Sequence, residues 1–333
     1  MGASESSSEI VSTSEAVQER SEWIRAQEIK KVAIEEFLKS IEKELPEKNK
    51  DVREHAAKVL DEEEFEHFKR QFRFAGPKSL NFFVITGISE EFENLESNVS
   101  SQFPRPEEVE GMKNEPYYVD TKEFNNRLYF VLGRFESNKW TDPSTGEPQR
   151  DLYPDECVAV VNKETDLMHV RTADVSLCRE ICTTLARSIG VHPQQEDIFY
   201  KPQFDQAFIE KFGDEVEKYV NLTLHIDDSP DRTAGSVRFT SQKRENGEYM
   251  DLLDDEQVKE ELSEGDGNIS RGYVELKEGG FSFELNRAQS KIWFRNHERE
   301  NRINEIERLI DNVLKQSGGY PQQKLQGFGN IPE

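Results

Sequence analysis

The chain has 333 residues and an acid surplus of 67 Asp and Glu against 43 Lys and Arg, which gives a formal net charge of −24. A field of that sign repels phosphate backbones and anionic lipids, so the composition disfavours free nucleic acid or a membrane surface as the partner. The length is enough for about two domains. The 21 Phe and 9 Tyr indicate packed cores, because disordered chains are poor in aromatic residues.

The acid surplus has two open explanations: an ordinary solvated surface, or adaptation to a salty cytoplasm that screens self-repulsion. Three cysteines are too few for a disulfide framework, and no apolar run approaches the ~20 residues of a membrane-spanning helix. We therefore expect reduced thiols and a cytoplasmic protein. Residues 1–6 match the pattern for acylation of Gly2, but Ser and Glu rather than basic residues follow, which leaves the modification open.

The N-terminal part predicts a helical hairpin over residues 15–76, after a Ser/Glu-rich segment, 1–14, that is predicted to be disordered. Pro46 ends the first helix, and Asp51 is the expected N-cap of the second. The apolar positions of the first helix follow the spacing i, i+3, i+4, i+7 and include Ile34, Phe37, Leu38 and Ile41. Those of the second helix include Val59, Phe65, Phe68 and Phe72. This apolar surface exceeds what two helices can bury, so it must dock on the rest of the chain or on another molecule.

After Pro77 the hydrophobic pattern changes from helical to extended. Strands are predicted at 80–86 and 127–135, separated by an acidic, Pro-containing loop over 90–116. A turn-rich loop is expected around Trp140 and Gly146.

The clearest supersecondary unit is a β-hairpin at 157–161 and 167–171, followed by a helix that Asp174 caps and Gly190 ends. The same order recurs near the end of the chain. Strands there are predicted at 273–276, 281–285 and 290–294, and the helix at 298–315. Between these two blocks the pattern predicts a short helix at 204–212, strands at 219–226 and 236–240, and an acidic helix at 252–262.

Hairpins followed by helices are typical of the α+β class with a largely antiparallel sheet. We therefore predict an α+β domain over 77–226, and over 227–316 a second α+β domain or the second half of one core. A flexible tail is expected over 317–333.

The best catalytic candidates are Glu275 and Lys277, two residues apart and therefore on one face of a strand. This pair resembles the strand motif of the restriction-endonuclease-like nuclease fold, in which the acid ligates a divalent metal. The resemblance implies a further Asp, for which Asp266, or Asp231 after Pro230, is the nearest choice. No other metal or cofactor is predicted, because the six His are scattered and the chain has no phosphate-binding loop.

Three functions are consistent with these features. The first is a non-enzymatic, cytoplasmic interaction or scaffold protein whose helical hairpin binds a protein partner or a second copy of the chain. The residues offered to that partner are Ile34, Phe37, Leu38, Ile41, Phe65, Phe68 and Phe72. The second is a metal-dependent nuclease that uses Glu275, Lys277 and Asp266. The third is a regulatory module that binds a small ligand between the two hairpin-and-helix blocks.

Overall fold

The computed structural model describes residues 5–27, 29–47, 50–73, 79–109, 115–141, 143–192, 194, 199–226, 235–243, 248–263, 267–277, 282–295 and 298–320. Two compact units make up the chain: unit 1 comprises Met1–Lys78 and Phe294–Arg308, and unit 2 comprises Ser79–Trp293 and Leu309–Glu333. Asp231 and Asp266 lie outside the described residues, as does most of the predicted tail.

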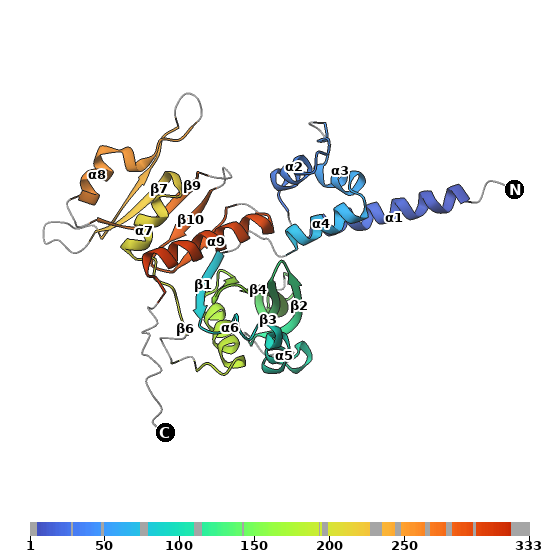
Figure 1. The fold of residues 1–333 in the computed structure, drawn as a ribbon. Helices are drawn as coiled ribbons and strands as arrows, with labels where there is room; N and C mark the ends of the chain where they lie inside the picture. Colours follow the sequence, from blue (N-terminus) through green and yellow to red (C-terminus); the bar gives the residue numbers. More distant parts are fainter. Residues whose placement is uncertain are drawn as a thin grey trace, which may run out of the picture. The chain divides into compact units, whose positions relative to one another are not determined.

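Unit 1 is helical (Figure 1). It contains α1 (Glu5–Ala26), α2 (Lys31–Ser40), α3 (Val52–Val59), α4 (Glu62–Phe72) and the first half of α9 (Glu300–Ser317). Helix α1 begins within the segment that the sequence predicts to be disordered. Asp51 caps α3 as predicted, because its side chain accepts a hydrogen bond from the backbone N–H of Arg53.

Each long helix that the sequence predicts is broken once. Lys30 is extended, with φ −67° and ψ 144°, and separates α1 from α2. Asp61 starts α4 with a capping box: its carboxylate accepts from the Glu64 N–H at 2.8 Å, and the Glu64 carboxylate accepts from the Asp61 N–H at 2.9 Å. This local capping satisfies donors that a helix start leaves open, so a new helix begins where the apolar period alone predicts continuation.

Aromatic side chains form the centre of unit 1. The rings of Phe37 and Phe68 meet edge to face with centroids 4.9 Å apart, and Trp23 packs edge-on against Phe65 and Phe68. Around them pack Ile24, Ile29, Ala33, Ile34, Leu38, Val52, Ala56, Ala57, Leu60 and Phe72. The N-terminal helices therefore bury their apolar faces largely against one another.

The segment 294–308 completes unit 1 through polar contacts. The amide of Gln71, which is buried, donates to Asn301 Oδ1 and accepts from the Asn301 N–H, both at 3.3 Å. Arg302 lies 3.5 Å from the Glu36 carboxylate, and Lys30 Nζ donates to the Arg295 carbonyl oxygen at 2.6 Å. The first half of helix α9 is thus part of unit 1.

Unit 2 is built on one 11-stranded sheet within the described residues, in the order β2-β3-β4-β5-β1-β11-β10-β9-β7-β8, with β6 paired to β1. The pairings among these strands are antiparallel. The strands are β1 (Ser79–Ile85), β2 (Tyr117–Phe124), β3 (Arg127–Thr141), β4 (Pro148–Asn162), β5 (Leu167–Arg171), β6 (Phe199–Tyr200), β7 (Val216–Ile226), β8 (Ser236–Thr240), β9 (Gly267–Leu276), β10 (Ser282–Asn286) and β11 (Lys291–Trp293).

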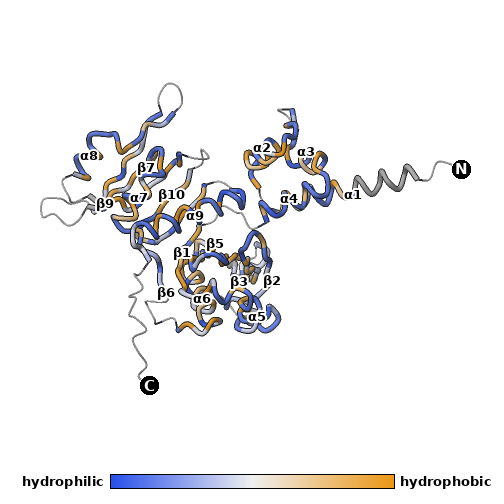
Figure 2. Tube along the Cα trace, in the orientation of Figure 1, coloured by the Kyte–Doolittle hydropathy of each residue, from blue (hydrophilic) through white to orange (hydrophobic). Residues whose placement is uncertain are grey.

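The described helices of unit 2 are α5 (Phe92–Gln102), α6 (Val175–Ser188), α7 (Gln206–Gly213), α8 (Glu256–Ser263), the second half of α9, and two short 3-10 helices, η1 (Pro106–Glu108) and η2 (Leu252–Asp254). In Figure 2 strand β1 is mostly hydrophobic in colour, whereas α8 is mostly hydrophilic. The predicted fold class, α+β with an N-terminal helical part followed by a largely antiparallel body, is confirmed.

The sheet is continuous through both predicted blocks, because β1 pairs with β5 on one side and with β11 on the other. Helix α6 lays its apolar face on strands β1 and β3–β5, and Leu177, Ile181 and Leu185 join their core. A ladder of Phe rings runs from β1 to β10 and comprises Phe82, Phe204, Phe208, Phe212 and Phe283, with neighbouring centroids 4.2 to 6.3 Å apart.

Two predicted loops are wrong. The segment predicted as a loop over 90–116 contains α5, whose Phe92, Leu95 and Val99 are buried at helical spacing between acidic neighbours. The loop expected around Trp140 is shorter than predicted, because β3 and β4 continue as paired strands to Thr141 and Pro148. In both cases a polar composition predicted a loop where the backbone forms a helix or paired strands.

Candidate functional site

The predicted catalytic residues lie at the end of β9 and are engaged in structural contacts. Glu275 Oε2 is 3.3 Å from Lys218 Nζ, on the neighbouring strand β7. Lys277 Nζ donates to the backbone carbonyl oxygen of Asp214, just after α7, at 2.6 Å. In the part of the chain that the structure describes, no three His, Cys, Asp or Glu side chains are grouped as metal ligands. The geometry therefore adds nothing to the nuclease hypothesis.

The residues that the sequence offers to a protein partner lie in the core of unit 1. Ile34, Phe37, Leu38, Phe65, Phe68 and Phe72 are buried, and Ile41 is partly buried against them. They face one another, which is one of the two arrangements that their pattern allows. A partner of unit 1 would have to use other side chains, or the core would have to open.

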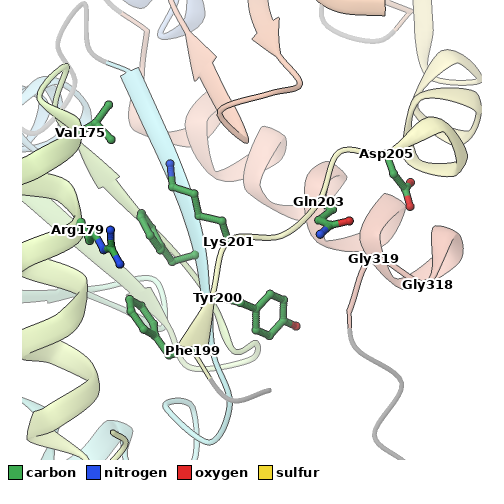
Figure 3. A pocket seen from close by; sticks show the side chains of 10 residues that line it. Val175, Arg179, Phe199, Tyr200, Lys201, Gln203, Asp205, Gly318 and Gly319 are labelled. Carbon is green, nitrogen blue, oxygen red and sulfur yellow. The ribbon is translucent and has the colours of Figure 1, made fainter. Parts of the chain in front are cut away.

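A cavity of about 660 Å³ lies in unit 2 (Figure 3). Four segments line it: β1 with Phe83, the first turn of α6, residues 199–205, and the two glycines that follow α9. The sequence pattern does not predict this cavity, because its side chains come from segments distant in the chain. The only local signal is the pair of aromatic residues followed by a lysine at 199–201.

Strand β6 forms the aromatic wall of the cavity. Its pairing with the end of β1 sets Phe199 opposite Ile85 and Tyr200 opposite Val84. The Phe199 ring lies nearly parallel to the Phe83 ring, with centroids 5.9 Å apart and planes 12° apart. Stacking and strand pairing together hold this wall in place.

Lys201 follows the aromatic wall and is held by neighbouring groups. Its ammonium lies 5.2 Å from the centroid of the Phe83 ring and donates to the Gln289 carbonyl oxygen at 3.2 Å. The Ser290 hydroxyl donates to the carbonyl oxygen of Pro202, which anchors the same segment. In Figure 3 Arg179 and Phe199 lie on one side of Lys201, and the Tyr200 ring points toward Gly318 and Gly319 on the other.

Two helices begin at the cavity. Asp174 caps α6 by accepting from the N–H groups of Ser176 and Leu177 at 2.8 and 3.1 Å, as the sequence predicts. Asp205 caps α7 by accepting from the Phe208 N–H at 2.9 Å. The partial positive charge of each helix N-terminus is therefore already matched by a capping carboxylate.

Helix α9 ends at the opposite wall. Gly318 adopts φ +73°, the left-handed conformation that commonly ends helices, and the Gly319 N–H donates to the Leu314 carbonyl oxygen at 2.9 Å. A Cβ on Gly319 would lie 2.7 Å from Leu314 Cδ2. The wall there is consequently bare backbone, which leaves peptide groups at the cavity surface.

Among the lining residues that the structure describes, two side chains are cationic and one, Asp205, is a carboxylate. Arg179 and Lys201 line the cavity, and neither forms an ion pair with a residue that the structure describes. Nearby, burial together with the charges of Lys201 and Arg271 lowers the pKa of Lys291. Burial raises the pKa of Tyr200, so its hydroxyl stays protonated at neutral pH and can donate a hydrogen bond. The one lining carboxylate named above, Asp205, already accepts a backbone hydrogen bond as a helix cap.

The three cysteines, Cys157, Cys178 and Cys182, are buried and form no disulfide. Burial raises the pKa of the Cys182 thiol, which keeps it protonated. Among the residues that the structure describes, no helix has both the length and the apolar character needed to cross a membrane.

Comparison with known proteins gives no assignment. No protein-family model matches the chain, and no curated protein matches it either. The site is therefore interpreted from its own geometry.

Proposed function

We propose that unit 2 is a binding module for a small anionic ligand, which occupies the cavity lined by β1, α6, residues 199–205 and the end of α9. This is the third of the functions that the sequence leaves open, and the proposal carries no catalytic step. The observation that supports it is a pair of cations that line the cavity, Arg179 near the start of α6 and Lys201 directly after β6. Neither has a carboxylate partner among the described residues, in a chain of net charge −24.

The balance of charges explains why such a site would accept an anion. An anion about 4 Å from one cation gains about 4 kcal/mol at the effective dielectric constant of a protein surface, before the cost of desolvation. Repulsion by the acidic surface acts over longer distances and is screened beyond about 8 Å at physiological salt. The local cations therefore outweigh the global charge for a small ligand.

The wall chemistry favours an organic ligand over a bare ion. Ligand sites usually have volumes of about 300–1,000 Å³ and combine apolar walls with a few polar groups. A volume of about 660 Å³ with aromatic, cationic and backbone groups matches that description. We expect the protein to perform this function in the cytoplasm, where its buried thiols stay reduced.

The test uses the full chain and measures the melting temperature and heat of binding with phosphate, sulfate and small organic phosphates and carboxylates at fixed ionic strength. Binding of at least one of these anions is expected, and it should be lost in Arg179→Gln and in Lys201→Gln. Arg187→Gln is the matched control, because Arg187 lies in the last turn of the same helix, outside the cavity. Equal binding in all four proteins, or none in the parent, would overturn the proposal.

A further inference from the structure

We infer that the ligand is a mononucleotide-like molecule, with its phosphate between Arg179 and Lys201 and its planar ring against Phe199. This inference rests on the proposed function and specifies the chemical class of the anion. The supporting observation is that the cavity has three chemically different surfaces.

The cationic surface fits a phosphate. Arg179 stands one turn after Val175, the first residue of α6, and lines the cavity with it. Lys201 reaches the same side of the cavity from the connecting segment (Figure 3). A guanidinium and an ammonium are groups that bind phosphate oxygens in proteins.

The aromatic surface fits a planar ring. Phe199 is stacked on Phe83 and is only partly buried, so part of it remains open to a ligand. Bases stack on aromatic side chains with little dependence on sequence, because every base presents a flat π-face. An anion without a ring would leave this surface exposed to water.

The third surface is polar. It comprises the Gln203 amide, the Tyr200 hydroxyl, the backbone of Gly318 and Gly319, and the Asp205 carboxylate, which already caps α7. An amide side chain and peptide groups both donate and accept hydrogen bonds, so they suit the hydroxyls of a sugar or the edge of a base. The cavity is also far larger than inorganic phosphate needs.

The overall charge separates a mononucleotide from a polymer. A nucleic-acid strand brings one negative charge for every nucleotide, and the net charge of −24 opposes each of them. A single phosphate meets only the local cations. The site thus favours a free nucleotide over a strand that carries the same groups.

The experiment measures dissociation constants of the full chain by calorimetry for AMP, GMP, CMP, UMP, adenosine and inorganic phosphate, and for a single-stranded oligonucleotide. At least one nucleotide should bind about tenfold more tightly than phosphate, and AMP more tightly than adenosine. Phe199→Leu should raise the dissociation constants of nucleotides about tenfold and leave that of phosphate unchanged. Arg179→Gln should raise the dissociation constants of nucleotides and of phosphate alike. Tyr153→Leu, an exposed aromatic residue on β4, is the control and should change neither.

The outcomes separate the two proposals. Two results would overturn the inference and leave the proposed function standing. In the first, phosphate binds through Arg179 and no nucleotide binds more tightly than phosphate. In the second, Phe199→Leu binds nucleotides as tightly as the parent does. If the oligonucleotide binds more tightly than every mononucleotide, the inference is also overturned. If neither these probes nor the other anions bind, both proposals fail. The melting temperature of each variant without ligand shows whether it is folded.

Discussion

Gly133 on β3 lies directly opposite Tyr117 on β2, and the tyrosine ring covers it. A Cβ at position 133 would lie 2.4 Å from two carbons of that ring, whereas ordinary contacts are 3.4–4 Å. The ring, which is 4% exposed and packs on Phe135, would have to move by about 1 Å. Overpacking of this kind costs about 1–3 kcal/mol, so Gly133→Ala should lower the free energy of unfolding.

In a Tyr117→Val background, Gly133→Ala should instead raise the free energy of unfolding. Without the ring the space is free, and replacing Gly by Ala in a strand gains about 0.5–1 kcal/mol, because the unfolded chain loses freedom. Urea unfolding of the parent, both single variants and the double variant, with unchanged m-values, measures this coupling. If Gly133→Ala destabilises equally in both backgrounds, the clash with Tyr117 is not its cause.

Three further predictions concern charge, core and capping. Asp174→Asn keeps the helix cap but loses the ion pair with Arg134, at 2.5 Å, and should cost about 1 kcal/mol at pH 7, discounted for partial exposure. Hydrogen bonding to Arg134 lowers the pKa of Asp174, so the carboxylate's contribution is complete above its unfolded pKa of about 3.9 and is lost as pH falls through the lower folded value. The difference in urea midpoint between parent and variant should therefore close below about pH 4, and a constant difference would refute this. Phe68→Ala, at a fully buried ring that contacts four aromatic residues, should destabilise unit 1 by about 3–5 kcal/mol, seen as faster hydrogen exchange in α1–α4. Asp61→Ala should cost about 1 kcal/mol and speed exchange in the first turn of α4, while unchanged exchange there would show that the capping box is dispensable.

Local signals in the sequence predicted most of the strands and several caps. The bounds of β5 and β8 agree with the predicted segments 167–171 and 236–240. Asp51 and Asp174 cap helices as expected. These features depend on residues near each other in the chain, namely on period and on short polar side chains before an apolar run.

Features that depend on distant residues could not be predicted. The pairing of β1 with β11 joins Asn81 to Lys291, and nothing local marks either residue for the other. The cavity has the same origin, because Arg179, Lys201 and Gly319 meet only after the sheet has formed. Helix α5 was missed for another reason: its three apolar positions are diluted by Glu, Ser and Asn, so composition outweighed spacing.

The division of helix α9 between the two units has a consequence for folding during translation. Domains generally fold in the order in which they emerge, beginning at the N-terminus. Here residues 294–308 belong to the same unit as helices α1–α4, so these helices emerge well before the segment that completes their unit. Until residues 294–308 have been synthesised, Gln71 and Glu36 lack Asn301 and Arg302. Unit 1 therefore reaches its final structure only after strands β1–β11 of unit 2 have been synthesised.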